Sequence, residues 1–272
     1  MLNGTWGIWS CGWDFHKPSQ DLVNSFKTQA GLPELKATKD HNSYPINNDD
    51  SNTQKWDPRL FHTVGMPTFP YRYEKAYTLT KANSRTPNTY GYYTSLKEVP
   101  QRSKGETYDT PWQAFAMNEY VIRYTGSMLD RAEALVELGR LDEAENIINA
   151  IRQRAANSIE KHIDYAANQC EIALYPKNYF ASKNVARECV RRERRLELGM
   201  EHERFFDLRR WGVASKTLNA YFERESQASY EGQNYAQYYK DAHFTPQKNE
   251  FFPIPYNQLY YIPGLYMQNR GY

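Results

Sequence analysis

Three indole side chains near the start of the chain are the residues best suited to bind a ligand. Trp6, Trp9 and Trp13 are interleaved with glycines in a segment that we expect to be an exposed loop. An indole can cover the flat CH face of a pyranose ring while neighbouring amide and guanidinium groups reach the hydroxyls. Three such rings are costly to leave in water without a use. They therefore indicate either a sugar-stacking site or a surface that packs against another segment.

Sequence signatures of catalysis are absent. The chain has no Gly-x-Ser-x-Gly elbow, no His-Glu-x-x-His pair, no Walker loop and no Gly-x-Gly-x-x-Gly turn. We therefore predict no catalytic residue, no bound metal and no cofactor. Paired carboxylates for glycoside cleavage stay open, because their separation is spatial and leaves little trace in a sequence. His202 is expected on a helix surface, and segment 40–52, which lacks EF-hand spacing, is expected to be a solvated loop rather than a calcium site.

Charged side chains are densest between Arg187 and Arg210, where arginines alternate with acids. Interleaved signs favour ion pairs within the protein over a patch that binds phosphate or nucleic acid. We expect pairs along helix faces, at separations of three and four residues. The pairs predicted in this way are Glu188 with Arg192, Arg194 with Glu197, and Arg204 with Asp207.

Composition excludes several classes of protein. With 272 residues, 40% of them hydrophobic and 24% charged, the chain can bury a core, and its formal net charge of +2 is too small to indicate a nucleic acid or an anionic membrane as main partner. No apolar run is long enough to span a membrane. Cys11, Cys170 and Cys189 are expected to be free thiols. Although Ile8–Cys11 loosely matches a lipobox, no basic or apolar leader precedes it, so Cys11 is predicted to be a loop thiol.

Apolar periodicity predicts a mainly α-helical protein. A short helix should begin at Ser19 and end at Gly31, whereas eight prolines between residues 32 and 113 favour loops and short strands. Two helices, 115–138 and one beginning at Leu141, should form an antiparallel hairpin, because their connection is so short. A second hairpin is expected from helices at 182–198 and 205–212. The Tyr-rich tail from Leu218 is expected to be extended at Phe251–Pro255 and to pack over the helices.

Several motifs, in this order, resemble the SusD/RagB family, glycan-binding lipoproteins of the Bacteroidota outer membrane. The helix pair also resembles a tetratricopeptide pair through Ala132, Gly139 and Ala144. The matching segments are Pro18–Phe26, Asp57–Leu60, Arg123–Tyr124, Ala132–Ala134, Asn149–Arg154, Glu193–Leu198, Arg204–Gly212, Phe252–Pro255 and Gln268–Tyr272. The resemblance covers nearly the whole chain, and we expect residues 1–272 to be the C-terminal part of a SusD/RagB-like domain whose N-terminal half is missing.

The resemblance implies a mainly α, SusD-like fold with tetratricopeptide-like hairpins, irregular loops and short β segments. It also implies non-catalytic capture of an oligosaccharide or polysaccharide for a SusC-like TonB-dependent transporter, at the cell surface on the outer membrane, with the signal peptide and lipid anchor outside this sequence. The matched motifs are scaffold, so only Trp6, Trp9 and Trp13 are predicted to contact ligand. The alternatives are a helical-repeat scaffold that binds proteins, a peptide-binding family member, and a glycan-cleaving enzyme.

Overall fold

The computed structural model describes residues 16–34, 54–84, 91–97, 99–104, 118, 120–226, 229–230, 233–234 and 239–272. Trp6, Trp9, Trp13, Cys11 and segment 40–52 lie outside these residues. The helices are α1 (Gln20–Asn24), α2 (Arg59–Thr63), α4 (Tyr124–Glu137), α5 (Leu141–His162), α6 (Lys183–Glu197), α7 (Arg204–Arg210), α8 (Ala214–Glu225) and α9 (Tyr256–Tyr261), with 3-10 turns at Lys81–Asn83, Arg102–Lys104 and Asp164–Gln169.

The strands are short, with two to five residues each. They are β1 (Lys27–Gln29), β2 (Leu32–Pro33), β3 (Lys55–Trp56), β4 (Val64–Gly65), β5 (Pro70–Tyr71), β6 (Glu74–Thr78), β7 (Thr94–Ser95), β8 (Ser229–Tyr230) and β9 (Gln233–Asn234). Among the described strands the pairings are antiparallel, in the order β2-β1-β3 and as the pairs β4-β7, β5-β6 and β8-β9, and one isolated parallel bridge joins Trp56 to Cys170. The described residues are therefore mainly α, with short β segments, as the sequence predicts.

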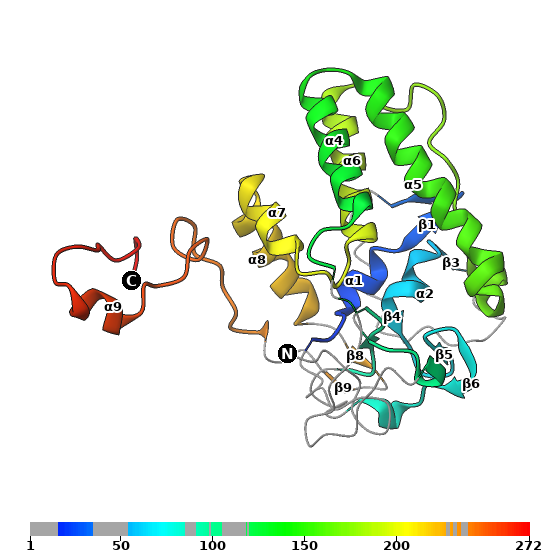
Figure 1. Ribbon diagram of the computed structural model, residues 1–272, viewed down its shortest axis with the longest axis horizontal. Coiled ribbons are helices and arrows are strands. Elements are labelled where there is room, and N and C mark those ends of the chain that lie inside the picture. The colour runs from blue at the N-terminus through cyan, green and yellow to red at the C-terminus, as the bar shows by residue number, and fades with distance from the viewer. Residues whose placement is uncertain are drawn as a thin grey trace.

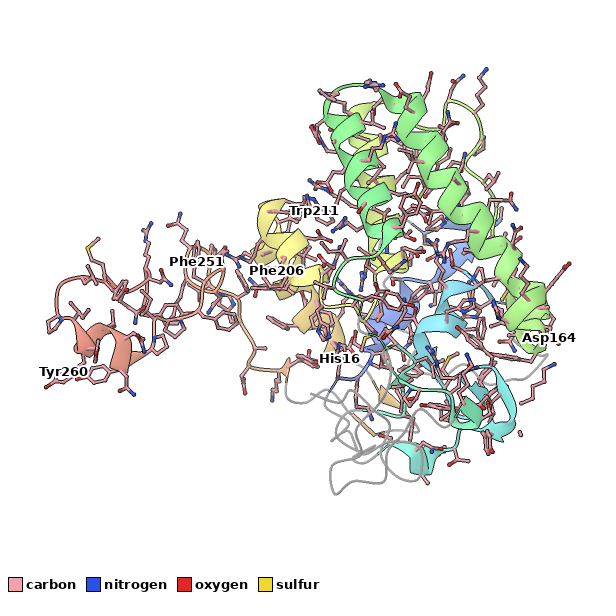
Figure 2. All side chains as sticks on the ribbon, viewed as in Figure 1. His16, Asp164, Phe206, Trp211, Phe251 and Tyr260 are labelled. Atoms are coloured by element: carbon pink, nitrogen blue, oxygen red, sulfur yellow. The ribbon has the colours of Figure 1, made fainter. Side chains whose placement is uncertain are left out.

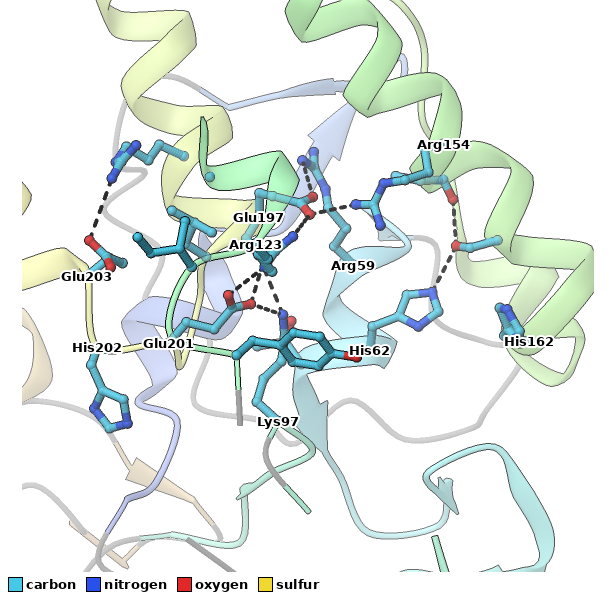
Figure 3. Close-up of a pocket in the computed structure, with 18 of the residues that line it drawn as sticks. Arg59, His62, Lys97, Arg123, Arg154, His162, Glu197, Glu201, His202 and Glu203 are labelled. Atoms are coloured by element: carbon cyan, nitrogen blue, oxygen red, sulfur yellow. Dashed lines mark hydrogen bonds and ion pairs between the residues drawn. The ribbon is translucent and has the colours of Figure 1, made fainter. Parts of the chain in front are cut away.

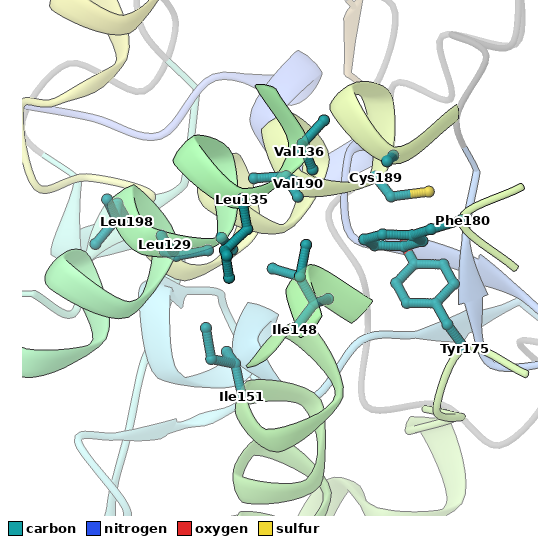
Figure 4. Packing of buried hydrophobic residues seen from close by; sticks show 13 residues of the cluster. Leu129, Leu135, Val136, Ile148, Ile151, Tyr175, Phe180, Cys189, Val190 and Leu198 are labelled. Carbon is teal, nitrogen blue, oxygen red and sulfur yellow. The ribbon is translucent and has the colours of Figure 1, made fainter. Parts of the chain in front are cut away.

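Helices α4, α5 and α6 form the upright part of the molecule in Figure 1 and enclose its largest apolar cluster. Gly139, between α4 and α5, has a φ of +78°, a backbone conformation that lets the chain reverse tightly. The predicted antiparallel hairpin is therefore confirmed, and α6 packs against both of its helices. Figure 4 shows the side chains that fill the space between the three, among them Leu129, Leu135, Val136, Ile148, Ile151 and Val190.

Helix α4 begins at Tyr124, nine residues later than the periodicity predicts. Val121 and Ile122, expected in its apolar stripe, precede the helix and are exposed. Apolar spacing alone could not place this boundary, because Arg123 has extended backbone angles and directs its guanidinium to carboxylates of another element. Gly126, in the first turn, adds little support for a longer helix.

The start of α6 is confirmed, and α6 contacts α7 through the ion pair of Arg194 with Asp207 at 2.6 Å, while the predicted hairpin of these two helices stays a prediction. The Ser182 side chain accepts a hydrogen bond from the backbone N–H of Val185 and caps α6. Helix α7 packs against α8, a helix that the Tyr-rich composition did not reveal, and the two share a small apolar cluster. Its buried members are Leu208, Ala214 and Phe244.

Helix α1 is shorter than predicted but begins as expected. The hydroxyl of Ser19 accepts from the N–H of Leu22 at 3.2 Å, and α1 ends at Asn24, well before Gly31. The carboxylate of Glu225, from α8, accepts from the N–H groups of Gln20 and Asp21 at 2.9 and 3.1 Å. A carboxylate at a helix N-terminus is stabilised by the free amides and the helix dipole. This contact joins α1 to the end of α8, about 200 residues apart in the sequence.

The C-terminal segment 251–272 extends away from the helices in Figure 1. The prediction that the tail packs over the helices is therefore wrong for 252–272, whereas Phe244 packs against α7 and α8 as expected, and Phe251–Pro255 lacks helix as expected. Large side chains such as Phe252, Tyr260 and Tyr261 are exposed, and Figure 2 shows Tyr260 far from the body. The segment is closed by its own polar contacts: Gln268 both accepts from the N–H and donates to the carbonyl of Ile254. The sequence could not predict this, because apolar residues indicate burial but do not identify the surface on which they pack.

No helix among the described residues is both long and apolar enough to cross a membrane.

Candidate functional site

A wide hollow of about 1590 Å³ opens between the end of α6, the face of α5 and the residues that precede α4. Its floor includes residues of α2, and the turn between β5 and β6 adds Arg72 and Tyr73. Figure 3 shows these elements converging around the Arg123 guanidinium. Exposed rim residues such as Tyr120, whose side chain is 79% exposed, connect the hollow to solvent. Most of the lining is polar or charged.

Glu197, at the last turn of α6, is the central anion of the hollow. Its carboxylate accepts from Arg123 at 2.8 Å and from Arg154 at 2.6 Å, and lies 3.6 Å from Arg59. The side chain is only 3% exposed. Burial alone would raise the pKa of Glu197, but the charges of the three guanidiniums outweigh it and hold that pKa at about 2. The carboxylate is therefore ionised throughout the physiological range.

A second carboxylate, Glu193, lies one turn earlier on α6 and deeper in the protein. It accepts from Arg59 at 2.8 Å and from Arg152, and all three side chains are buried. Arg59 also forms a bidentate pair with Asp57, at 2.8 and 2.6 Å. Arg152 donates further to the carbonyl of Gly31 at 2.6 Å, which fixes the turn between β1 and β2 to α5. Buried charges paired in this way specify how the elements meet.

The predicted pair of Arg194 with Glu197 is wrong in its partner, and no ion pair joins Arg204 to Asp207 among the described residues, whereas the pair of Glu188 with Arg192 stays a prediction. Arg194 pairs with Asp207 of α7 and Asp130 of α4, each at 2.6 Å, and not with Glu197. Arg195 pairs with Asp21 of α1 at 2.5 Å. The sequence correctly indicates internal pairing rather than an anion-binding patch in this segment. It misses the partners because spacing within one helix carries no information about charges from other elements.

Arg123 and Lys97 extend this network to the mouth of the hollow. Both donate to the carboxylate of Glu201, Arg123 at 2.6 Å and Lys97 at 2.5 Å. Arg123 also donates to the carbonyl of Glu197 at 2.7 Å. One guanidinium thereby satisfies the open carboxyl end of α6 and holds the chain that leads into α4.

His62, from α2, lies beside the hollow in a chain of hydroxyl contacts. Its Nδ1 is 2.8 Å from the Tyr73 hydroxyl, and its Nε2 is 2.8 Å from Oγ of Ser158. Ser158 donates its proton to the carbonyl of Ala155 at 2.6 Å, so it accepts from Nε2–H, and Nδ1 accepts from Tyr73. Burial and the nearby cation Lys97 lower the pKa of His62 to about 4. The imidazole is therefore neutral at neutral pH.

His202 lies in the turn between α6 and α7, not on a helix surface as predicted. Its φ is +66°, and its ring stacks on that of His16 with 4.5 Å between centroids. Met200, two residues earlier, also has a positive φ, of 65°. These two residues turn the chain sharply after α6. The sequence did not predict this turn, because the pattern of alternating charges continues through it.

The hollow contains residues that the sequence alone did not single out as a site. Arg59, Arg123 and Glu197 belong to motifs that were assigned to the scaffold, and Tyr73 and Tyr120 carried no local signal. The predicted ligand residues Trp6, Trp9 and Trp13 lie outside the described part of the chain. No cluster of three or more metal-ligating side chains occurs among the described residues.

The fold and the site define a mainly helical protein in which a hairpin frame joined by buried ion pairs surrounds a wide, polar hollow. The chain belongs to the SusD family, whose model matches residues 2–272. No curated protein matches it.

Solved structures share the fold. One is a SusD superfamily protein from Bacteroides vulgatus, 23% identical with a TM-score of 0.59, and the match covers 100% of this chain and 48% of that one. Another is a SusD homolog from Bacteroides thetaiotaomicron, also 23% identical, with a TM-score of 0.52 and coverage of 79% and 41%. The chain thus spans about half the length or less of the solved relatives.

Proposed function

We propose that this protein binds an oligosaccharide or polysaccharide without cleaving it, as part of nutrient uptake at the cell surface. The observation that carries the proposal is membership of the SusD family over residues 2–272. The proposal includes delivery of the glycan to a SusC-like TonB-dependent transporter, and an outer-membrane location through a lipid anchor. It treats residues 1–272 as the C-terminal part of a longer SusD-like domain.

The hollow has the chemistry that a glycan site needs. Tyr73 and Tyr120 offer ring faces, and Gln153 and Asn157, on the α5 face, offer amides that can bond to sugar hydroxyls. The volume of about 1590 Å³ exceeds that of a typical small-molecule pocket and suits several sugar units. Trp6, Trp9 and Trp13 remain proposed stacking residues on the basis of the sequence.

Two features support binding without turnover. A glycosidase needs a carboxylic acid whose pKa is raised so that it can protonate the leaving group. Among the described carboxyl groups, every resolved shift lowers the pKa, and at Glu197 in the hollow the value is about 2. The Ser158 hydroxyl, although next to His62, gives its proton to a backbone carbonyl rather than to the imidazole.

Affinity-gel electrophoresis and calorimetry against a panel of neutral and acidic polysaccharides test the proposal. We expect binding of at least one glycan with no release of reducing sugar. Tyr120→Ala and Trp-to-Ala changes at positions 6, 9 and 13 should each weaken it. Tyr260→Ala, in the projecting segment, is the matched control and should not. Failure of every glycan to bind would reject the proposal, and release of reducing sugar would reject its non-catalytic part.

A second candidate function is a scaffold that binds a protein partner. The projecting segment 251–272 favours it, because side chains such as Phe252, Tyr260 and Met267 are largely exposed, and large aromatic residues are enriched at protein interfaces. Specific, saturable binding of a purified partner that is lost in Tyr260→Ala, combined with no response to any glycan, would favour this function over the first.

A further inference from the structure

We propose that the glycan taken by the hollow is an acidic one, carrying carboxylate or sulfate groups that contact Arg72 and Lys161. This inference rests on the proposed function and adds the chemical class of the ligand. The lining holds seven lysines and arginines against four acids. The excess of positive charge is unusual for a chain whose formal net charge is only +2.

The charges are unevenly distributed around the hollow. The four lining acids, Asp130, Glu197, Glu201 and Glu203, lie on α4 and on the end of α6 with the turn that follows it. The opposite side, formed by α5 and the β5–β6 turn, contributes Arg72, Arg154 and Lys161. We call this set the cationic wall. Figure 3 shows Arg154, His62 and His162 on the side opposite Glu201 and Glu203.

Helix α5 presents one polar face to the hollow. Arg154, Ser158 and Lys161 are four and three residues apart and share this face. The helix contains acids, such as Glu145 and Glu160, but none of them lines the hollow. A face with cations and hydroxyls but no carboxylate suits an anion better than a neutral sugar.

The cations of the cationic wall contact fewer carboxylates than the remaining arginines that line the hollow. Arg59, Arg123 and Arg194 each contact two or more carboxylates. In contrast, Arg72 donates only to the carbonyl of Leu96 at 2.7 Å, and no ion pair joins Lys161 to any described residue. Arg154 does pair with Glu197, but its side chain remains 58% exposed.

A structural role explains part of this arrangement. Lys161 and His162 lie in the last turn of α5, where positive charge stabilises the helix dipole by about 0.3–1 kcal/mol. That role does not account for Arg72, which comes from a turn between strands. Arg72 and Tyr73 both have positive φ, of 47° and 73°, and the Tyr73 ring lies 5.4 Å from that of His162. The turn thus places a cation and an aromatic face beside the end of α5.

Matched pairs of glycans test the inference. Oligogalacturonate is compared with its methyl ester, hyaluronan with its methyl ester, and chondroitin sulfate with desulfated chondroitin, so that each pair differs in charge and not in backbone. Calorimetry should show that the charged member of at least one pair binds more tightly. That preference should shrink when ionic strength rises from 0.01 to 0.1 M, since the Debye length falls from about 30 Å to about 10 Å.

Lys161→Glu is the diagnostic variant and Lys177→Glu is its control, because Lys177 is also exposed but does not line the hollow. Lys161→Glu should weaken the acidic glycan about five- to tenfold, as expected for one charge-assisted contact, and leave its neutral counterpart unchanged. Lys177→Glu should change neither. Circular dichroism of both variants checks that they fold alike.

The outcomes separate the two proposals. If only neutral glycans bind, or if both members of every pair bind equally, the inference is wrong and the proposed function stands. If polyglutamate of matched charge binds as tightly as the acidic glycan, the wall recognises acidic polypeptide and the inference is wrong. If no glycan of either kind binds, the proposed function fails as well.

Discussion

Replacing Glu197 by glutamine should destabilise the protein by about 3 kcal/mol at neutral pH. The carboxylate is almost fully buried and contacts Arg123 and Arg154 within 2.8 Å. Its pKa falls from 4.5 to about 2, and each unit corresponds to about 1.4 kcal/mol of differential stabilisation. Breaking a buried pair costs about 3–5 kcal/mol. The lower end applies, because Arg59 keeps Asp57 and Glu193.

Urea unfolding followed by circular dichroism measures this loss. A change of about 3 kcal/mol should move the midpoint by about 1 M or more with an unchanged slope. Glu143→Gln is the matched control: its pair with Arg140 is as short, at 2.6 Å, but exposed on one helix, so the midpoint should stay within error.

The difference between wild type and Glu197→Gln should also depend on pH in one direction. A carboxyl whose folded pKa lies below its unfolded value contributes its full stability above the unfolded pKa, and loses it as pH falls toward the folded pKa. The gap should therefore close between about pH 5 and pH 2. A midpoint no lower than that of Glu143→Gln, or a gap that persists undiminished at the acid end, would refute this account of the network.

Three further predictions concern packing, capping and protonation. Gly65→Ala should destabilise the protein by about 1–3 kcal/mol in thermal unfolding, since a Cβ there would lie 2.5 Å from Oγ1 of Thr94. Gly126→Ala should stabilise it by up to about 1 kcal/mol, because a Cβ there meets nothing within 4 Å. The opposite order of the two variants would contradict this packing. Ser182→Ala should cost about 1 kcal/mol by removing the cap of α6, and Ser182→Asp should restore it; equal losses in both variants would argue against capping. Nitrogen NMR should show His62 neutral with its proton on Nε2 at pH 5.5, and a midpoint near 6.5 would show that burial does not govern its charge.

The sequence predicts the helices best where apolar residues recur every three or four positions along one face and the ends carry capping residues. Ser19 and Ser182 mark true helix starts, and Gly139 marks the reversal between α4 and α5. Prediction fails where a tertiary contact decides. Helix α4 starts only after Arg123, because the Arg123 guanidinium binds two carboxylates, Glu197 and Glu201, at the end of α6. Nothing in the sequence near Val121 or Ile122 reveals this contact.

The candidate site could be predicted only in part for the same reason. Arg59, Arg123 and Glu197 stand in motifs that the family resemblance singles out, but the hollow they help to line is formed by six separate stretches of chain. The place of Tyr73 and Lys161 in the site depends on neighbours that are not adjacent in the sequence. The Tyr73 hydroxyl, for example, lies 2.8 Å from Nδ1 of His62, eleven residues earlier. Ion pairs between different elements, and not the spacing of charges along one helix, determine which charged side chains are left to contact a ligand.

The position of α6 has a consequence for the rate at which backbone amides exchange their hydrogens with solvent. Its charged side chains contact α1, α2, α4, α5 and α7, so its middle turns can open only when all five contacts are lost together. The slowest amides among the described residues should therefore lie near Val190 and Glu193, with exchange limited by global unfolding. Those of 252–272, for which the described residues show no ion pair with the helices, should exchange by local opening and far sooner.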